Sequence, residues 1–130
     1  MRRSITQLAV TLAGVLVLVA TTVLPLQPVF GEGGARRDVV RQEEQNRKDA
    51  VEHAKEAVDH GKQGDVEALL AHAEAALQHA LKGGQDQHLD EAITHLKEAI
   101  EHGKAGHADV ATKHAETAVM HLSEVARRRG

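Results

Sequence analysis

The chain of 130 residues contains no cysteine, two prolines and a single aromatic residue. Without cysteine it can form no disulfide, no thiolate zinc site and no iron–sulfur cluster. The aromatic residue, Phe30, lies in an N-terminal segment that we predict is removed, so no aromatic platform remains on which bases or sugars could stack. Any site for a transition metal must therefore be built without thiolates.

The first 31 residues have the composition of a secretory signal peptide. A basic start with Arg2 and Arg3 precedes an apolar run from Leu8 to Leu24 and a helix-breaking region around Pro25. We predict cleavage after Gly31, which makes the chain an exported protein without stable membrane association. The alternative is an uncleaved membrane anchor, because the 17 uncharged residues of the apolar run nearly span a bilayer; a twin-arginine signal has less support.

The charge balance argues against nucleic acid as a partner. The whole chain has a formal net charge of −3 with neutral histidines, and removal of residues 1–31 takes away two arginines and no acid, which leaves −5. A polyanion would be repelled by such a surface. We therefore expect no nucleic acid partner.

Two similar segments follow one another in the remaining chain. A shift of 42 positions lays residues 50–81 over residues 92–123 with 14 identities in 32 positions. Each segment is interrupted by glycines that can take the left-handed conformation that stops a helix, at Gly61 and Gly64 and again at Gly103 and Gly106. Each repeat is therefore predicted to be one helical hairpin, and Asp65 suits the N-cap of its second helix.

Four helices are expected, near residues 38–60, 65–82, 87–102 and 107–127. Apolar residues recur in them at the a, d and e positions of a heptad, with Leu89 and Leu96 at a and Ala92 and Ala99 at d in the third helix. The first helix has fewer apolar residues at these positions and has Arg47 at an a position. Short connections make neighbouring helices antiparallel, so we predict an all-α, antiparallel up-down-up-down four-helix bundle. Residues 46–130 form this bundle, and residues 32–45 are an N-terminal extension that includes the start of the first helix.

Ten histidines occupy the g positions of the four predicted helices, and successive histidines within a helix are always seven residues apart. Seven residues rise by about 10.5 Å, so histidines of one helix share a face but cannot share one metal ion. A second helix must complete each site. The candidate metal ligands are His53, His60, His72, His79, His88, His95, His102, His107, His114 and His121.

Residues of antiparallel helices lie at equal height when their numbers add to a constant. This rule places the histidines in three layers and pairs them along two helix–helix seams. Either the two helices of one hairpin or helices of different hairpins face each other at these seams, depending on the handedness of the bundle. Glu56 and Glu98 follow His53 and His95 by three residues and are candidate third ligands.

Imidazole nitrogens suit copper(II), nickel, zinc and cobalt, and among these copper(II) binds most strongly. Because only neutral imidazole coordinates, occupancy should fall as the pH drops through about 6.5, the ordinary range of histidine. A single histidine on a helix is usually a solvated polar residue. The regular spacing across four helices instead indicates metal binding.

Catalytic motifs are not found. The sequence contains no nucleophile elbow, no phosphate-cradling loop and no His-Glu-x-x-His helix. The Glu-x-x-His spacing of ferritin-like di-iron centres is also absent. We therefore predict a binding protein, not an enzyme, with no catalytic residues.

Several short motifs resemble the small metal-binding protein (SmbP) family. They are Glu-His-Ala-Lys-Glu-Ala at 52–57, His-Gly-Lys-Gln-Gly at 60–64, and His-Ala-Glu at 72–74 with a copy at 114–116. The resemblance covers about residues 46–125. It implies a periplasmic four-helix bundle that binds several copper(II) ions, and other divalent metals less selectively, for buffering or detoxification.

Two functions are compatible with these observations. One is an exported, monomeric protein that buffers, sequesters or detoxifies metal ions. The other is a metal-independent helical adaptor or envelope stress protein whose histidines respond to pH. Metal titration distinguishes between them.

Overall fold

The computed structural model describes residues 32–128, which form four helices: α1 (Glu32–Lys62), α2 (Val66–Ala80), α3 (Gln87–Lys104) and α4 (Ala108–Arg128). No strand occurs in this part of the chain, so the predicted all-α class is confirmed. None of the four helices is long and apolar enough to cross a membrane. The predicted signal peptide lies outside the described residues.

The turns within each pair of helices are built on one left-handed glycine. Gly64 and Gly106 have φ angles of 78° and 79°, as their predicted role requires. Asp65 then caps α2, because its Oδ1 accepts a hydrogen bond from the backbone N–H of Ala68 at 3.1 Å. The sequence thus predicted both the conformation of these turns and the N-cap.

The structure corrects the role of the other two turn glycines. Gly61 and Gly103 are the second-last residues of α1 and α3, and neither has the left-handed conformation that was predicted for it. They are glycines because neighbouring helices approach closely: a Cβ on Gly103 would lie 2.8 Å from Cδ2 of Leu70. α1 also begins at residue 32, six residues before the expected position.

Small apolar side chains fill the interior. Leu89, Leu96, Ala92 and Ala99 are fully buried, which confirms their assignment to the a and d positions of the third helix. Two clusters share this core, one around Leu89, Leu96 and Leu122 and the other around Leu69. Because alanine dominates both clusters, the helices lie close together and each residue buries little area.

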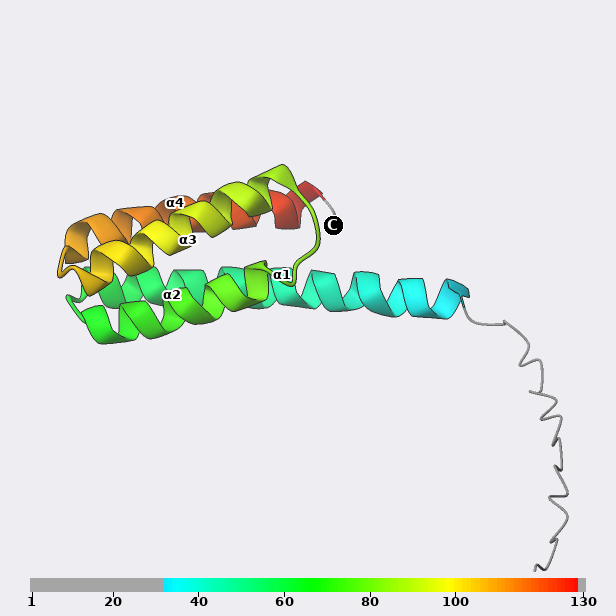
Figure 1. Cartoon of the computed structure of the whole chain (residues 1–130), viewed down its shortest axis with the longest axis horizontal. Coiled ribbons are helices and arrows are strands. Elements are labelled where there is room, and N and C mark those ends of the chain that lie inside the picture. The colour runs from blue at the N-terminus through cyan, green and yellow to red at the C-terminus, as the bar shows by residue number, and fades with distance from the viewer. Residues whose placement is uncertain (1–31, 129–130) are drawn as a thin grey trace, which may run out of the picture.

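The helices contact one another in a cycle: α1 with α2, α2 with α3, α3 with α4, and α4 with α1. Figure 1 shows α1 and α2 side by side beneath α3 and α4. Contacts between α1 and α2 join residue 53 to residue 72 and residue 46 to residue 79, so higher numbers on one helix meet lower numbers on the other. The same relation holds for His88 with His121 and His95 with His114.

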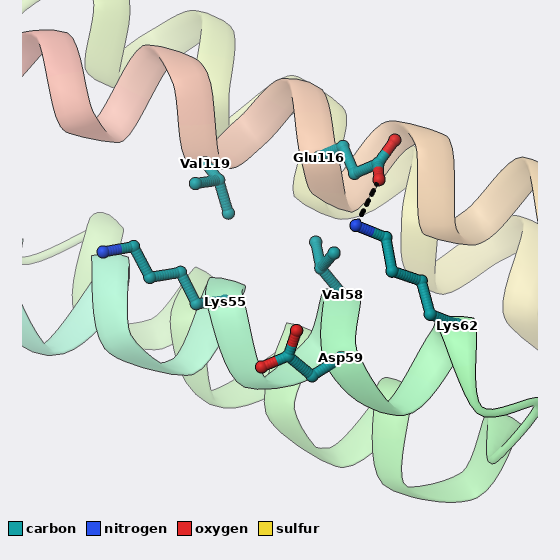
Figure 2. Close-up of a pocket in the computed structure, with 6 residues that line it drawn as sticks. All are labelled: Lys55, Val58, Asp59, Lys62, Glu116 and Val119. Atoms are coloured by element: carbon teal, nitrogen blue, oxygen red, sulfur yellow. Dashed lines mark ion pairs between the residues drawn. The ribbon is translucent and has the colours of Figure 1, made fainter.

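α1 and α4 meet along a groove that contains no histidine (Figure 2). Val58 and Val119 line it, and the ammonium group of Lys62 lies 2.9 Å from a carboxylate oxygen of Glu116. This contact raises the pKa of Lys62, chiefly through the hydrogen bond to Glu116. On the other side, Lys104 of α3 pairs with Glu74 of α2 at 2.8 Å. Apolar side chains and exposed ion pairs thus join one pair of helices to the other.

Asn46 and Arg47 attach α1 to the linker between α2 and α3. Asn46 Nδ2 donates to the carbonyl of Lys82 at 3.3 Å, and the Arg47 guanidinium donates to the carbonyl of Gly83. Both side chains are buried. Arg47 therefore occupies its predicted a position. Its buried charge is tolerated beside the apolar core because the guanidinium is hydrogen-bonded to the backbone. The residues of α1 before Asn46 are mostly exposed and project beyond the other helices (Figure 1).

Candidate metal centres

The ten histidines meet along two faces of the bundle, one between α1 and α2 and one between α3 and α4. We call these the first seam and the second seam. Nine of the histidines are half-buried and His107 is exposed. Of the two arrangements that the sequence left open, the structure therefore has the one that pairs the histidines of α1 with those of α2 and the histidines of α3 with those of the α4 segment.

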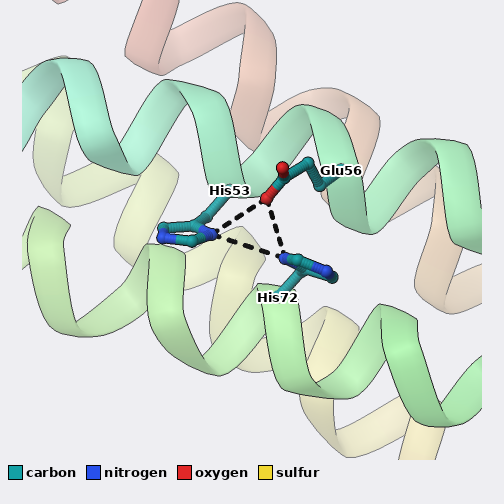
Figure 3. Close-up of side chains that lie close together, drawn as sticks. All are labelled: His53, Glu56 and His72. Carbon is teal, nitrogen blue, oxygen red and sulfur yellow. Dashed lines mark hydrogen bonds and ion pairs between the residues drawn. The ribbon is translucent and has the colours of Figure 1, made fainter.

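The central contact of the first seam joins two histidines and one carboxylate (Figure 3). Nδ1 of His53 lies 3.4 Å from Nδ1 of His72, and Oε2 of Glu56 lies 3.0 Å from the former and 2.9 Å from the latter. Glu56 reaches this point because it follows His53 by three residues, almost one helical turn. Three potential ligand atoms thus face one point.

The second seam contains two groups with the same composition. In one, the Nδ1 atoms of His95 and His114 are 3.2 Å apart and Oε2 of Glu98 lies 3.0 Å from each. In the other, the Nδ1 atoms of His88 and His121 are 3.4 Å apart, and Oε2 of Glu91 lies 3.2 Å from the first and 2.9 Å from the second. Each of the three groups, two here and one on the first seam, has ligand atoms that all lie within 4.8 Å of one another.

Glu91 was missed by the sequence analysis. It follows His88 by three residues, which is the spacing that identified Glu56 and Glu98. The shift of 42 residues lays Glu91 over Asp49, and both positions lie just before the repeats at residues 92–123 and 50–81. The spacing from histidine to carboxylate was therefore the better signal.

These distances fit a divalent first-row ion. With bonds of about 2.0 Å, two neighbouring ligands of a tetrahedral or square-planar ion lie roughly 2.8–3.3 Å apart. The nitrogen–nitrogen and nitrogen–oxygen distances of the three groups run from 2.9 to 3.4 Å. Each group therefore has room for one ion bound to two nitrogens and one oxygen, with other positions left for water.

One atom of these groups lacks a hydrogen bond although it is buried. Oε2 of Glu98 lies 3.0 Å from two imidazole nitrogens but makes no hydrogen bond with acceptable geometry. A buried carboxylate oxygen without a hydrogen bond is costly. A metal ion bound between His95, Glu98 and His114 would satisfy it.

The remaining four histidines lie at the ends of the seams. Nδ1 of His102 is 3.5 Å from Nδ1 of His107 on the second seam. On the first seam, Nδ1 of His60 is 3.8 Å from Oδ2 of Asp65. Nδ1 of His79 is 3.2 Å from Oδ1 of Asn46 and 3.7 Å from Oδ2 of Asp49. Each predicted histidine thus lies beside a second potential ligand on the neighbouring helix or turn.

Imidazole rings also connect neighbouring levels of each seam. His53 stacks on His79 and His60 on His72, with centroids 5.6 and 5.1 Å apart. On the second seam, His95 stacks on His121 at 5.7 Å, and a similar contact joins the next level. The rings therefore form two continuous rows, which hold each other's orientation.

Comparison with known proteins agrees with this geometry. The model of a family described as small metal-binding protein matches residues 10–125 of the chain. No curated protein matches it. The matched region includes all ten histidines and the three associated glutamates.

Proposed function

The chain belongs to the small metal-binding protein family, and on this premise we propose that it reversibly binds several divalent transition metal ions, copper(II) foremost, to buffer, sequester or detoxify them. The observation that carries the proposal is the threefold occurrence of two imidazole nitrogens and one carboxylate oxygen about 3 Å apart. Histidines from different helices approach one another in each group. Such sites store and release ions without a chemical step, so the proposed role is binding and not catalysis.

Copper(II) is the proposed main cargo because of the ligands. Two imidazoles and a carboxylate suit borderline divalent ions, and affinity rises along the series to copper(II). Nickel, zinc and cobalt are expected to bind the same groups more weakly. The negative charges of Glu56, Glu91 and Glu98 favour any cation at these places.

We further propose that the four helices form an antiparallel up-down-up-down bundle made of two repeated hairpins, residues 50–81 and 92–123. The short turns at Gly64 and Gly106 and the contacts of residues 46, 53 and 60 with residues 79, 72 and 65 support this arrangement. The metal ligands then lie within each hairpin. The bundle is proposed to comprise residues 46–130, after the extension at 32–45.

The proposed location is the periplasm, after export by a signal peptide at residues 1–31. The basic start, the apolar run and the break before Gly31 support export. We propose a monomer that has metal ions as its partners and that associates neither with nucleic acid nor stably with a membrane after cleavage.

Titration of the protein with copper(II), nickel and zinc, followed by calorimetry, tests the proposed function. We expect several copper(II) ions per molecule, bound more tightly than by an unstructured histidine-rich peptide of the same histidine content. Electron spin resonance of the copper(II) protein should report two nitrogens bound to an ion in each of the three groups. Affinity no higher than that of the peptide would support the metal-independent adaptor instead.

A further inference from the structure

The two seams differ at three equivalent positions. Shifted by 42 residues, His88, Glu91 and His107 of the second seam correspond to Asn46, Asp49 and Asp65 of the first. The second seam therefore has three histidine pairs, and the first has one pair and two lone histidines. The lone histidines, His60 and His79, lie beside oxygen atoms instead.

At the turn between α1 and α2, Asp65 presents its second carboxylate oxygen to His60, which has no facing histidine. Oδ1 of Asp65 caps α2 through Ala68, while Oδ2 lies 3.8 Å from Nδ1 of His60. That Nδ1 atom is buried and makes no hydrogen bond. A cation between His60 and Asp65 would satisfy the nitrogen without disturbing the cap.

At the opposite end of the first seam, His79 faces two oxygens of α1. Oδ1 of Asn46 is 3.2 Å from its Nδ1, and Oδ2 of Asp49 is 3.7 Å away. Asn46 is held in place because its Nδ2 donates to the carbonyl of Lys82. One nitrogen and one or two oxygens are therefore available here, where the second seam presents His88, His121 and Glu91.

We infer that the chain has two classes of metal site: four two-histidine sites that hold copper(II) tightly, and two sites with one histidine and oxygen ligands, at His60 with Asp65 and at His79 with Asp49, that hold it loosely. The inference rests on the proposed function. Its physical basis is ligand preference, since copper(II) favours imidazole nitrogen whereas carboxylate and amide oxygens suit harder ions. The two ends of the first seam would then exchange ions, while the centre of the first seam and the whole second seam retain them.

Exchange of the residues at one pair of equivalent positions tests the inference. Asp65→His places a second histidine beside His60, as His107 stands beside His102, and His107→Asp makes the reverse change. The full chain and each variant are loaded with copper(II) and challenged with a competing chelator, and the retained ions are counted. We expect Asp65→His to retain one more ion than the unchanged protein and His107→Asp to retain one fewer.

Asp59→His is the matched control. Asp59 lies in the same helix as His60 but lines the groove between α1 and α4, away from both seams (Figure 2). It adds a histidine without a facing partner, so the number of retained ions should not change. If Asp59→His and Asp65→His retained the same number of additional copper(II) ions, the inference would be overturned. Retention would then depend on the number of histidines and not on their position.

Asp65→His also removes the N-cap of α2, so a second pair of variants tests the inference without changing a cap. His60→Ala and His102→Ala change equivalent positions on the two seams and leave all caps intact. His102→Ala should remove one retained ion, whereas His60→Ala should remove only an ion that the chelator already takes. If His60→Ala and His102→Ala lost the same number of retained ions, the inference of two site classes would be wrong, while the proposed function would be unaffected. Absence of copper(II) binding by the unchanged protein would instead refute the function itself.

Discussion

Nδ1 of His95 lies 3.2 Å from Nδ1 of His114, although 18 residues separate them along the chain and they belong to different helices. The two nitrogens approach because α3 and α4 pack against each other and place both side chains on the same face of the pair. Glu98 closes the group from within α3. The site is thus a property of two packed helices, which neither helix possesses alone.

The shared site makes a prediction about single and double variants. His95→Ala and His114→Ala should each abolish tight binding of the same copper(II) ion, because one remaining imidazole cannot hold it. The double variant should lose no further ion, so the two effects should be strongly non-additive. Counting tightly bound copper(II) in the four proteins measures this, and additive losses would mean that the two histidines bind separate ions.

The carboxylate of each group gives a second prediction. Glu98→Gln keeps the size of the side chain but removes its charge and its stronger ligand oxygen. Outer-shell partners alone change metal affinity by about 10- to 100-fold, so loss of a direct ligand should weaken this site by at least about tenfold. Competition against a chelator measures the affinity.

Glu101→Gln is the control for this prediction, because Glu101 also lies in α3 but is exposed. Glu91→Gln should behave like Glu98→Gln at its own group. Equal affinities of Glu98→Gln and Glu101→Gln would show that only general negative charge, and not a ligand, is involved.

The sequence predicted the helices and the layers of histidines because both follow from periodicity. Seven-residue spacing places His88, His95 and His102 on one face, and the buried Leu89 and Leu96 fix the face beside it. Periodicity cannot say which neighbouring helix lies against a face. That choice depends on packing around the whole bundle, and only the structure shows α1 against α2 and α3 against α4 at the histidines.

Residues with two roles were the hardest to predict. Asn46 was not among the predicted site residues, yet it is buried and joins His79 to the linker at Lys82. Gly61 was predicted to take the left-handed conformation that stops a helix, yet it lies in the last turn of α1 without that conformation and allows close packing there. In both cases the deciding contact comes from a distant part of the chain, which local sequence rules do not include.

Close packing at Gly61 makes a prediction about stability. In Gly61→Ala the new Cβ would overlap Oγ1 of Thr112 and lie 2.7 Å from Cδ1 of Leu69. Thr112 cannot turn away freely because its hydroxyl donates to the carbonyl of Ala108 at 2.8 Å. Overpacking of this kind costs about 1–3 kcal/mol, more than the gain of up to about 1 kcal/mol from replacing a helical glycine by alanine.

Gly34→Ala is the matched control for this substitution. Gly34 also lies in α1, but a Cβ there would meet nothing within 4 Å. It should therefore leave stability unchanged or raise it. Urea unfolding compares the two, and equal free energies of unfolding for Gly61→Ala and Gly34→Ala would contradict the packing argument.

Metal binding should stabilise the fold, because each two-histidine site exists only when two helices are packed together. An ion that binds the folded chain alone, at a free concentration of 100 times its Kd, adds about 2.7 kcal/mol to the free energy of unfolding per site. Copper(II) should therefore raise the melting temperature, and a chelator should reverse the rise. The double variant His95→Ala/His114→Ala should show a smaller rise than the unchanged protein because one site is lost. If copper(II) raised both melting temperatures equally, no ion that stabilises the fold would be bound between His95 and His114.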